Sequence, residues 1–149
     1  MALSTTTITN SIAALSITGV TIKDIDEVPD KVEGRDCPIL FPEPDGFLSN
    51  PTVTPMSTGT AGSGYFDVEY DMRYTFLYKP VGAGRGLLAT YPTMLSYALA
   101  IVDKIVVSDT VTGAVNLTFA GFEDFGAATD PAGNIFIGTR MLFHVLEFE

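Results

Sequence analysis

The longest regular pattern in the chain is an alternation of apolar and mostly polar residues over positions 65–79, YFDVEYDMRYTFLYK. Successive side chains of a strand point to opposite faces, so this alternation predicts one β-strand of fifteen residues. One face of the predicted strand is apolar and consists of Phe66, Val68, Tyr70, Met72, Tyr74, Phe76 and Tyr78. The other face is mostly polar and carries Asp67, Glu69, Asp71, Arg73 and Thr75.

This strand is long for the size of the chain. At about 3.3 Å per residue it would span about 50 Å, whereas a compact domain of this length has a diameter of about 40 Å. We therefore expect the strand to bend or to reach past its own domain. An overhanging strand leaves unpaired backbone groups that another chain can satisfy, which predicts contact between subunits.

Shorter patterns predict the remaining elements. Apolar residues recur at helical spacing in residues 4–16 and 90–107, and apolar residues alternate or cluster as in strands in residues 20–25, 37–41, 115–122 and 135–149. The apolar run of residues 37–41 contains Pro38 and is followed by Pro42, which predicts an edge strand. Both alternating sets of residues 135–149 are apolar, as is typical of a central strand covered on both faces. The helix over 90–107 is expected to bury Met94, Leu95, Ala98, Ile101, Val102 and Ile105.

These elements do not alternate as strand and helix, which a parallel sheet would require. The order predicts an α+β fold, with an antiparallel or mixed sheet and two main helices packed on one face. We expect a single domain over residues 1–149. Residues 42–64 are rich in Pro, Gly, Ser, Thr and Asn and predict a loop of about 20 residues, a length that usually has a role.

Composition narrows the class of protein. The chain is 46% apolar and 17% charged, which disfavours disorder. It has no run of ~18 to 20 apolar residues and no basic stretch ahead of an apolar one at its start, so we expect neither a membrane span nor a secretory signal. Its 18 acidic and 8 basic residues give a net charge of −10, which argues against a protein that grips nucleic-acid phosphates.

Candidate chemical groups are sparse. His144 and Cys37 are the only residues of their types, and we expect His144 on a sheet surface and Cys37 as a small hydrophobe, with no catalytic role for either. The glycines of residues 81–86 lack the Gly-Lys-Ser/Thr ending of a phosphate loop and favour a flexible turn. No metal site, cofactor or enzymatic activity is predicted.

The acidic row of the long strand has two interpretations. Asp67, Glu69 and Asp71 are spaced about 7 Å apart along a strand, whereas a calcium loop wraps its oxygens around the ion. The row is either a solvated strand face with Arg73 as partial counter-charge, or an acidic wall in an assembly.

Four segments, ITNSIAAL, YFDVEYDMRYTFLYK, TYPTMLSYALAIVDKI and MLFHVLEFE, follow one another with long loops between them. This arrangement resembles the tail terminator and related neck proteins of long-tailed bacteriophages over nearly the whole chain. Such proteins commonly form a hexameric ring that caps the tail tube, ends its polymerisation and faces the head connector or stopper, while DNA passes through the ring. The resemblance implies a structural virion protein that is made in the host cytoplasm, with itself, the tail tube protein and the connector as partners and with no membrane contact.

Under this resemblance the acidic balance would let DNA slide through the ring without sticking. Asp67, Glu69 and Asp71 are then the expected channel or interface charges. Loops 42–64 and 81–88 are the expected contact loops, with Asp45, Phe47, Asn50 and Arg85 as contact residues.

Two alternatives stay open. Residues 42–64 are longer than a minimal terminator needs and would suit the arm of a head–tail adaptor or another minor tail protein. A small ligand-binding or enzymatic α+β domain would instead need an apolar pocket with convergent polar groups.

Overall fold

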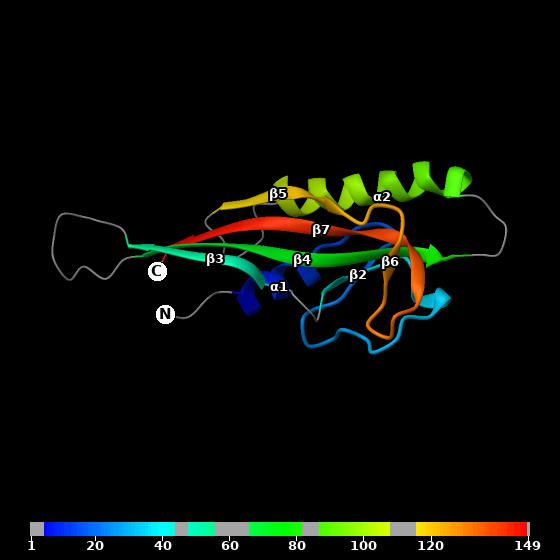
Figure 1. Cartoon of the computed structure of the whole chain (residues 1–149), viewed down its shortest axis with the longest axis horizontal. Coiled ribbons are helices and arrows are strands. Elements are labelled where there is room, and N and C mark those ends of the chain that lie inside the picture. The colour runs from blue at the N-terminus through cyan, green and yellow to red at the C-terminus, as the bar shows by residue number, and fades with distance from the viewer. Residues whose placement is uncertain (1–4, 44–47, 56–65, 82–86, 108–115, 149) are drawn as a thin grey trace.

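The computed structural model describes residues 5–43, 48–55, 66–81, 87–107 and 116–148 (Figure 1). It describes the side chains of residues 7–43, 68–81, 90–106 and 117–146.

A seven-stranded sheet forms the centre of the fold. Its main order is β1 (Thr21–Ile22), β2 (Ile39–Pro42), β4 (Phe66–Pro80), β7 (Ile135–Phe148) and β5 (Asn116–Glu123), while β3 (Leu48–Pro55) also pairs with β4 and β6 (Ala128–Thr129) with β7. Only β1 and β2 run parallel, so the sheet is mixed. Two helices, α1 (Thr5–Ala13) and α2 (Leu87–Val107), pack against one face. The predicted α+β fold is confirmed.

The long strand β4 is continuous, as predicted, but both of its edges are paired within the chain. β7 pairs with it from Asp67 to Pro80. On the other edge β3 pairs with residues 66–72 and β2 with residues 74–77. Figure 1 shows β3, β4 and β7 extending together beyond the two helices. The expectation of an overhanging strand with unpaired backbone groups is therefore wrong, because the neighbouring strands are extended alongside it.

The helices and one face of the sheet enclose the main core. Alternate residues of β4 and β7 point into it, as the period of two requires. Its members are buried and come from both helices and from three strands: Ile8, Ile12, Leu40, Val68, Tyr70, Met72, Tyr74, Phe76, Met94, Ala98, Ile101, Ile105, Ile137, Met141, Phe143 and Val145. Because residues of α1 and α2 belong to the same cluster, the two helices share one face of the sheet.

The opposite face is apolar only at one end. A smaller cluster there consists of Val32, Ile39, Phe41, Leu77, Ala128 and Phe136, with Val28 and Cys37 packed against it. Farther along β7, Leu142 and Leu146 are only half-buried. The prediction that β7 is central is confirmed, and its second face is fully covered only near Phe136.

Three local predictions need correction. Residues 42–64 contain β3, whose Pro51 and Pro55 are tolerated because β3 pairs with β4 alone among the described strands. β2 lies between β1 and β4 and is not an edge strand. Leu95 is 40% exposed, because it lies with Leu99 on the outer side of α2.

Candidate functional site

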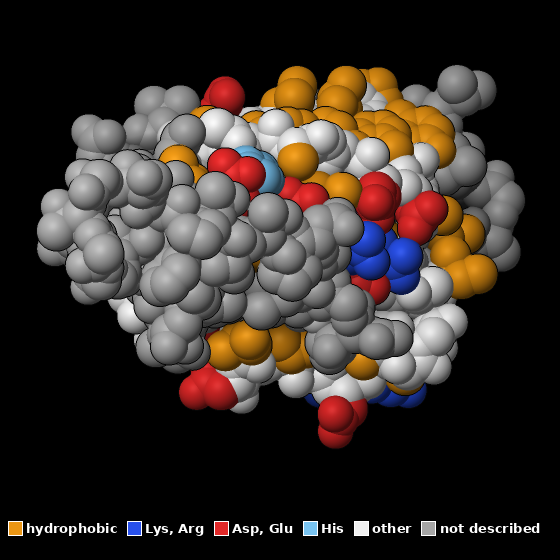
Figure 2. Space-filling model, turned by 60° about the vertical axis from the view of Figure 1, so that its left-hand side comes forward, with side chains coloured by type: hydrophobic (Ala, Val, Ile, Leu, Met, Phe, Trp, Pro, Cys, Tyr) orange, Lys and Arg blue, Asp and Glu red, His pale blue; other side chains and the backbone are white. Residues whose placement is uncertain are grey.

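Two residues of the predicted acidic row, Glu69 and Asp71, lie on the face of the sheet that the helices leave open. Asp71 of β4 lies directly opposite His144 of β7, and His144 lies opposite Thr118 of β5. Figure 2 shows the histidine among acidic side chains, with basic side chains bordered by acidic ones farther along the same surface. We call this surface the polar face.

Two carboxylates flank the ring of His144 on the polar face. Asp71 Oδ1 lies 2.9 Å from His144 Nδ1, and Glu69 Oε2 lies 3.8 Å from His144 Nε2. Asp71 and His144 are a cross-strand pair, and Glu69 is one step along the same face of β4, within reach of a long side chain. The strand pairing thus brings together groups that are 73 positions apart in the chain.

A second group of charges lies beside the first and consists of two arginines and three carboxylates. Arg73 lies 3.3 Å from Glu123 and 4.0 Å from Glu43. Arg140 lies 3.1 Å from Glu43 and 2.9 Å from Asp124. The Glu43 side chain is only 12% exposed and stands between the two guanidinium groups. We call these five residues the arginine network.

This network changes the expected role of Arg73. The sequence pattern assigns Arg73 to the acidic row of its own strand as counter-charge. Among the described residues its ion pairs are with Glu43 and Glu123, while Asp71 faces His144. Of the predicted acidic row, the structure brings Glu69 and Asp71 together around one histidine.

The other predicted site residues are less well placed. Asp67 lies in β4 opposite Phe148, but its side chain is outside the described set. Asn50 belongs to β3, between Ser49 and Thr52 where the register shifts, and its side chain is also outside that set. Asp45, Phe47 and Arg85 lie outside the described residues altogether.

Sequence reasoning missed Glu43, Arg140 and the position of His144 beside the acidic row. Alternation places Arg140 and His144 on one face of their strand, which is a usable signal. The register of that strand against β4 is not encoded in any local pattern, so the partners were not identifiable.

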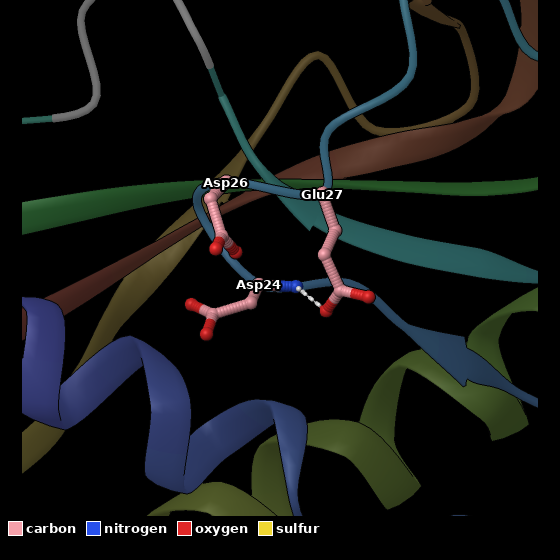
Figure 3. A group of neighbouring side chains, drawn as sticks. All are labelled: Asp24, Asp26 and Glu27. Carbon is pink, nitrogen blue, oxygen red and sulfur yellow. Dashed lines mark hydrogen bonds between the residues drawn. The ribbon is translucent and has the colours of Figure 1, made fainter.

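A third polar cluster lies in the turn after β1. Asp24, Asp26 and Glu27 bring carboxylate oxygens within 4.8 Å of one another (Figure 3). The Asp24 N–H donates to Glu27 Oε1 at 3.2 Å, and the Ile25 N–H donates to Asp24 Oδ1 at 2.7 Å. The Asn10 amide of α1 lies against the Asp24 carboxylate. These bonds are typical of acidic side chains that stabilise a turn.

The pKa values of Tyr74 and Cys37 are both raised, mainly by burial. Burial raises the pKa of Tyr74, and the nearby Asp24 charge raises it further. Burial also raises the pKa of the Cys37 thiol to about 11, with a smaller contribution from Asp36. Such a thiol stays protonated at neutral pH and is a poor nucleophile.

Asp130 is the buried carboxylate of the β6–β7 turn. It accepts bonds from the Val32 N–H at 3.0 Å, the Asn134 N–H at 2.7 Å and the Asn134 side-chain amide at 3.1 Å. Burial alone would raise its pKa, but these hydrogen bonds outweigh burial and lower it. Asp130 therefore fastens the segment around Val32 to the end of the sheet.

The two hollows described in the surface offer little convergent chemistry. One of about 390 Å³ lies between α2 and residues 16–18, and its lining consists of apolar side chains, hydroxyl groups and Lys104. The other, of about 280 Å³, is bordered by Glu43, Asp130 and Arg140, whose charged groups already have partners in the fold.

Exposed apolar side chains lie on α2 and just after the edge strand β5. Leu95 and Leu99 of α2 are 40% and 48% exposed, and Phe125, which follows the end of β5, is 41% exposed. Phe125 stacks on Tyr91 of α2 with ring centres 6.0 Å apart and contacts Phe122 at 5.4 Å. β5 itself pairs with β7 alone among the described strands, and it has no charged residue before Glu123.

No protein-family model matches the chain, and no curated protein matches it. Within the described part of the chain, neither helix has the length and apolar character needed to span a bilayer.

Proposed function

We propose that this protein is a structural component of a phage virion that forms a ring at the head-proximal end of the tail. The ring ends polymerisation of the tail tube and joins the tail to the head connector, with DNA passing through it. The phage assignment is supported by the resemblance of the four segments, and self-association is supported by β5. The observation that carries the association is an edge strand with no charge before its last residue, on a sheet whose covering helix α2 exposes Leu95 and Leu99.

Edge strands are normally protected from pairing by charges, prolines or irregular register. β3, which pairs only with β4, has Pro51, Pro55 and a register shift between Ser49 and Thr52. β5 has a bulge near Gly121 but carries neither proline nor a charge before its last residue. Among the described strands β5 is therefore the long edge best suited to receive another chain.

The net charge of the chain also favours contact at this place. Copies that each carry a charge of −10 repel one another, so their contact surface needs a low charge density. β5 and the outer side of α2 provide such a surface. A ring closes when this surface meets a different surface on the next copy, in a head-to-tail arrangement.

The acidic residues of the polar face are the proposed channel or interface charges. Glu69 is exposed and Asp71 is half-buried on this face. A channel wall of this sign would repel the phosphate backbone and reduce sticking of DNA during its passage.

The test is the assembly state of untagged protein, measured by light scattering after size-exclusion chromatography and by negative-stain microscopy. Both are done with the protein alone and with tail tubes added, because some assembly proteins associate only on their partner. We expect rings of about six copies, by the resemblance and closed symmetry. A protein that stays monomeric with tubes present, or a monomer that turns over a substrate, contradicts the proposal.

The contact surface is tested by Leu99→Glu, with Ile25→Glu as the matched control. Both side chains are exposed and apolar, but Ile25 lies in the turn after β1. We expect Leu99→Glu to abolish rings and Ile25→Glu to leave them intact, with unchanged circular dichroism for both. If Ile25→Glu abolishes rings and Leu99→Glu leaves them intact, the contact between copies does not lie on α2. A terminator is distinguished from a head–tail adaptor by the tubes, since only a terminator limits their length.

A further inference from the structure

We propose that Glu69 and His144 bind a divalent transition-metal ion of the zinc class on the polar face, with Asp71 orienting the histidine ring. The proposal does not rest on the ring-forming function. It departs from the expectation that the chain has no metal site, because the cross-strand register that brings these residues together is not visible in the sequence.

The contact with Asp71 determines which ring nitrogen of His144 carries the proton in the neutral ring. A carboxylate offers only hydrogen-bond acceptors, so the 2.9 Å contact places a proton on His144 Nδ1, which donates to Asp71 Oδ1. In the neutral ring, Nε2 then carries the free lone pair. A carboxylate that holds one ring nitrogen while the other binds the ion is a recurrent arrangement in metal sites.

On the other side of the His144 ring, the gap between Nε2 and the Glu69 carboxylate can hold an ion. His144 Nε2 and Glu69 Oε2 are 3.8 Å apart, which is too long for a hydrogen bond. Zinc bonds of about 2.1 Å to nitrogen and oxygen at a tetrahedral angle place the two ligand atoms about 3.4 Å apart. A shift of a few tenths of an ångström in the Glu69 side chain closes the difference.

The proposed ligands are accessible to an ion from solvent. The side chains of His144 and Glu69 are 40% and 51% exposed, so an ion reaches them and water fills its remaining positions. Asp71 lies on β4, which is paired on both edges at this position, and its side chain is 21% exposed. Imidazole nitrogen together with carboxylate oxygen suits zinc, nickel and copper better than magnesium or calcium.

The chain offers a direct readout, because His144 is its only histidine. Zinc chloride is titrated into untagged, ¹⁵N-labelled protein at pH 7.5 in a non-chelating buffer, and the ring nitrogens are followed by long-range ¹H–¹⁵N spectra. Calorimetry gives the affinity. We expect the Nε2 signal to shift on zinc addition while Nδ1 keeps its proton. A ring spectrum unchanged at saturating zinc overturns the proposal and leaves the histidine as a simple ion-pair partner.

Variants assign the ligands. We expect His144→Ala to abolish zinc binding and Glu69→Gln to weaken it at least tenfold. Asp71→Asn should weaken it about 10- to 100-fold through the ring orientation. Glu69 and His144 are surface residues, so folding is verified by circular dichroism. Zinc affinity that survives His144→Ala also overturns the proposal.

Two further variants exclude other binding groups. Asp26→Asn disrupts the acidic turn of Asp24, Asp26 and Glu27, and Cys37→Ser removes the only thiol. Both should bind zinc as the parent protein does. If Asp26→Asn removes binding, the ion belongs to the acidic turn and the proposal fails.

Discussion

The two faces of the sheet are built by the same strands but differ in burial and charge over most of their length. Tyr74 and Phe143 are fully buried beneath the helices, whereas their sequence neighbours Arg73 and His144 lie half-exposed among carboxylates. Over the middle of β4 and β7, a step of one residue therefore moves from a dry core to a wet, charged surface. Stability is concentrated on one face, and the groups available for binding lie on the other.

The largest effect is expected from Phe143→Ala on the helix face. The ring packs edge-on against Tyr74 at 6.0 Å and against Phe119 at 5.7 Å. Its loss should lower the free energy of unfolding by about 3 to 5 kcal/mol, measured by urea denaturation. The adjacent Leu142 faces the other way and is half-buried, so Leu142→Ala should cost about 1 kcal/mol. Equal losses at the two positions would contradict the division between the faces.

A smaller loss in the free energy of unfolding is expected for Asp130→Ala, at the apolar end of the sheet face opposite the helices. The change removes an acceptor shared by Val32 and Asn134. It leaves the buried Val32 N–H and the part-buried Asn134 donors without that acceptor, which should cost about 2 to 3 kcal/mol. Asp130→Asn keeps one acceptor oxygen and should cost less.

The same carboxylate predicts a pH dependence. The pKa of Asp130 is lowered in the folded state, so its contribution to stability is present above the unfolded value of about 3.9 and is lost as the pH falls through the folded value. The stability difference between the parent and Asp130→Asn should shrink below about pH 4. A difference that stays constant down to pH 2 would show that the charge has no part in it.

A modest effect is expected in the arginine network. Glu43→Gln leaves the half-buried Arg73 and Arg140 without the carboxylate between them, which should cost about 1 to 2 kcal/mol after allowance for solvent screening. The matched control is Glu33→Gln, whose partner Arg35 is 82% exposed, and it should change stability by less than about 0.5 kcal/mol. Added salt should reduce the effect of Glu43→Gln only slightly.

The smallest expected effect is on the alkylation rate of Cys37, which packs on the smaller apolar cluster of the sheet face opposite the helices. With a pKa of about 11, only about 0.1% of the thiol is ionised at pH 8. Alkylation by iodoacetamide should therefore be slow in the folded protein and fast in urea. Fast alkylation without denaturant would show that this end of the open face is wet.

Local periodicity was enough to predict the elements that fill the core. The alternation of β4, the doubly apolar β7 and the helical spacing of α1 and α2 all follow from side-chain direction within one element. Prediction failed where a residue sits at the margin of a pattern or where partners are distant. Leu95 borders the buried sector of α2 and faces solvent, and β3 was hidden because edge strands tolerate proline.

The candidate site was predictable only in part, for the same physical reason. Glu69 and Asp71 are two positions apart in one strand, so their side chains point to the same face. Their approach to His144, and that of Arg73 to Glu43, depends on the register between strands far apart in the chain. That register is set by the packing of the whole core, which no short segment encodes.

The pairing of β4 with β7 also has a consequence for the time course of folding. Partners such as Asp71 and His144 are separated by 73 positions, so the central pair closes only after a long loop has been ordered. Proteins dominated by such non-local pairs fold in milliseconds to seconds, far more slowly than helical bundles. During synthesis β4 leaves the ribosome well before β7. Until β7 follows, one edge of β4, the strand with the most residues in the main core, stays open to other nascent chains.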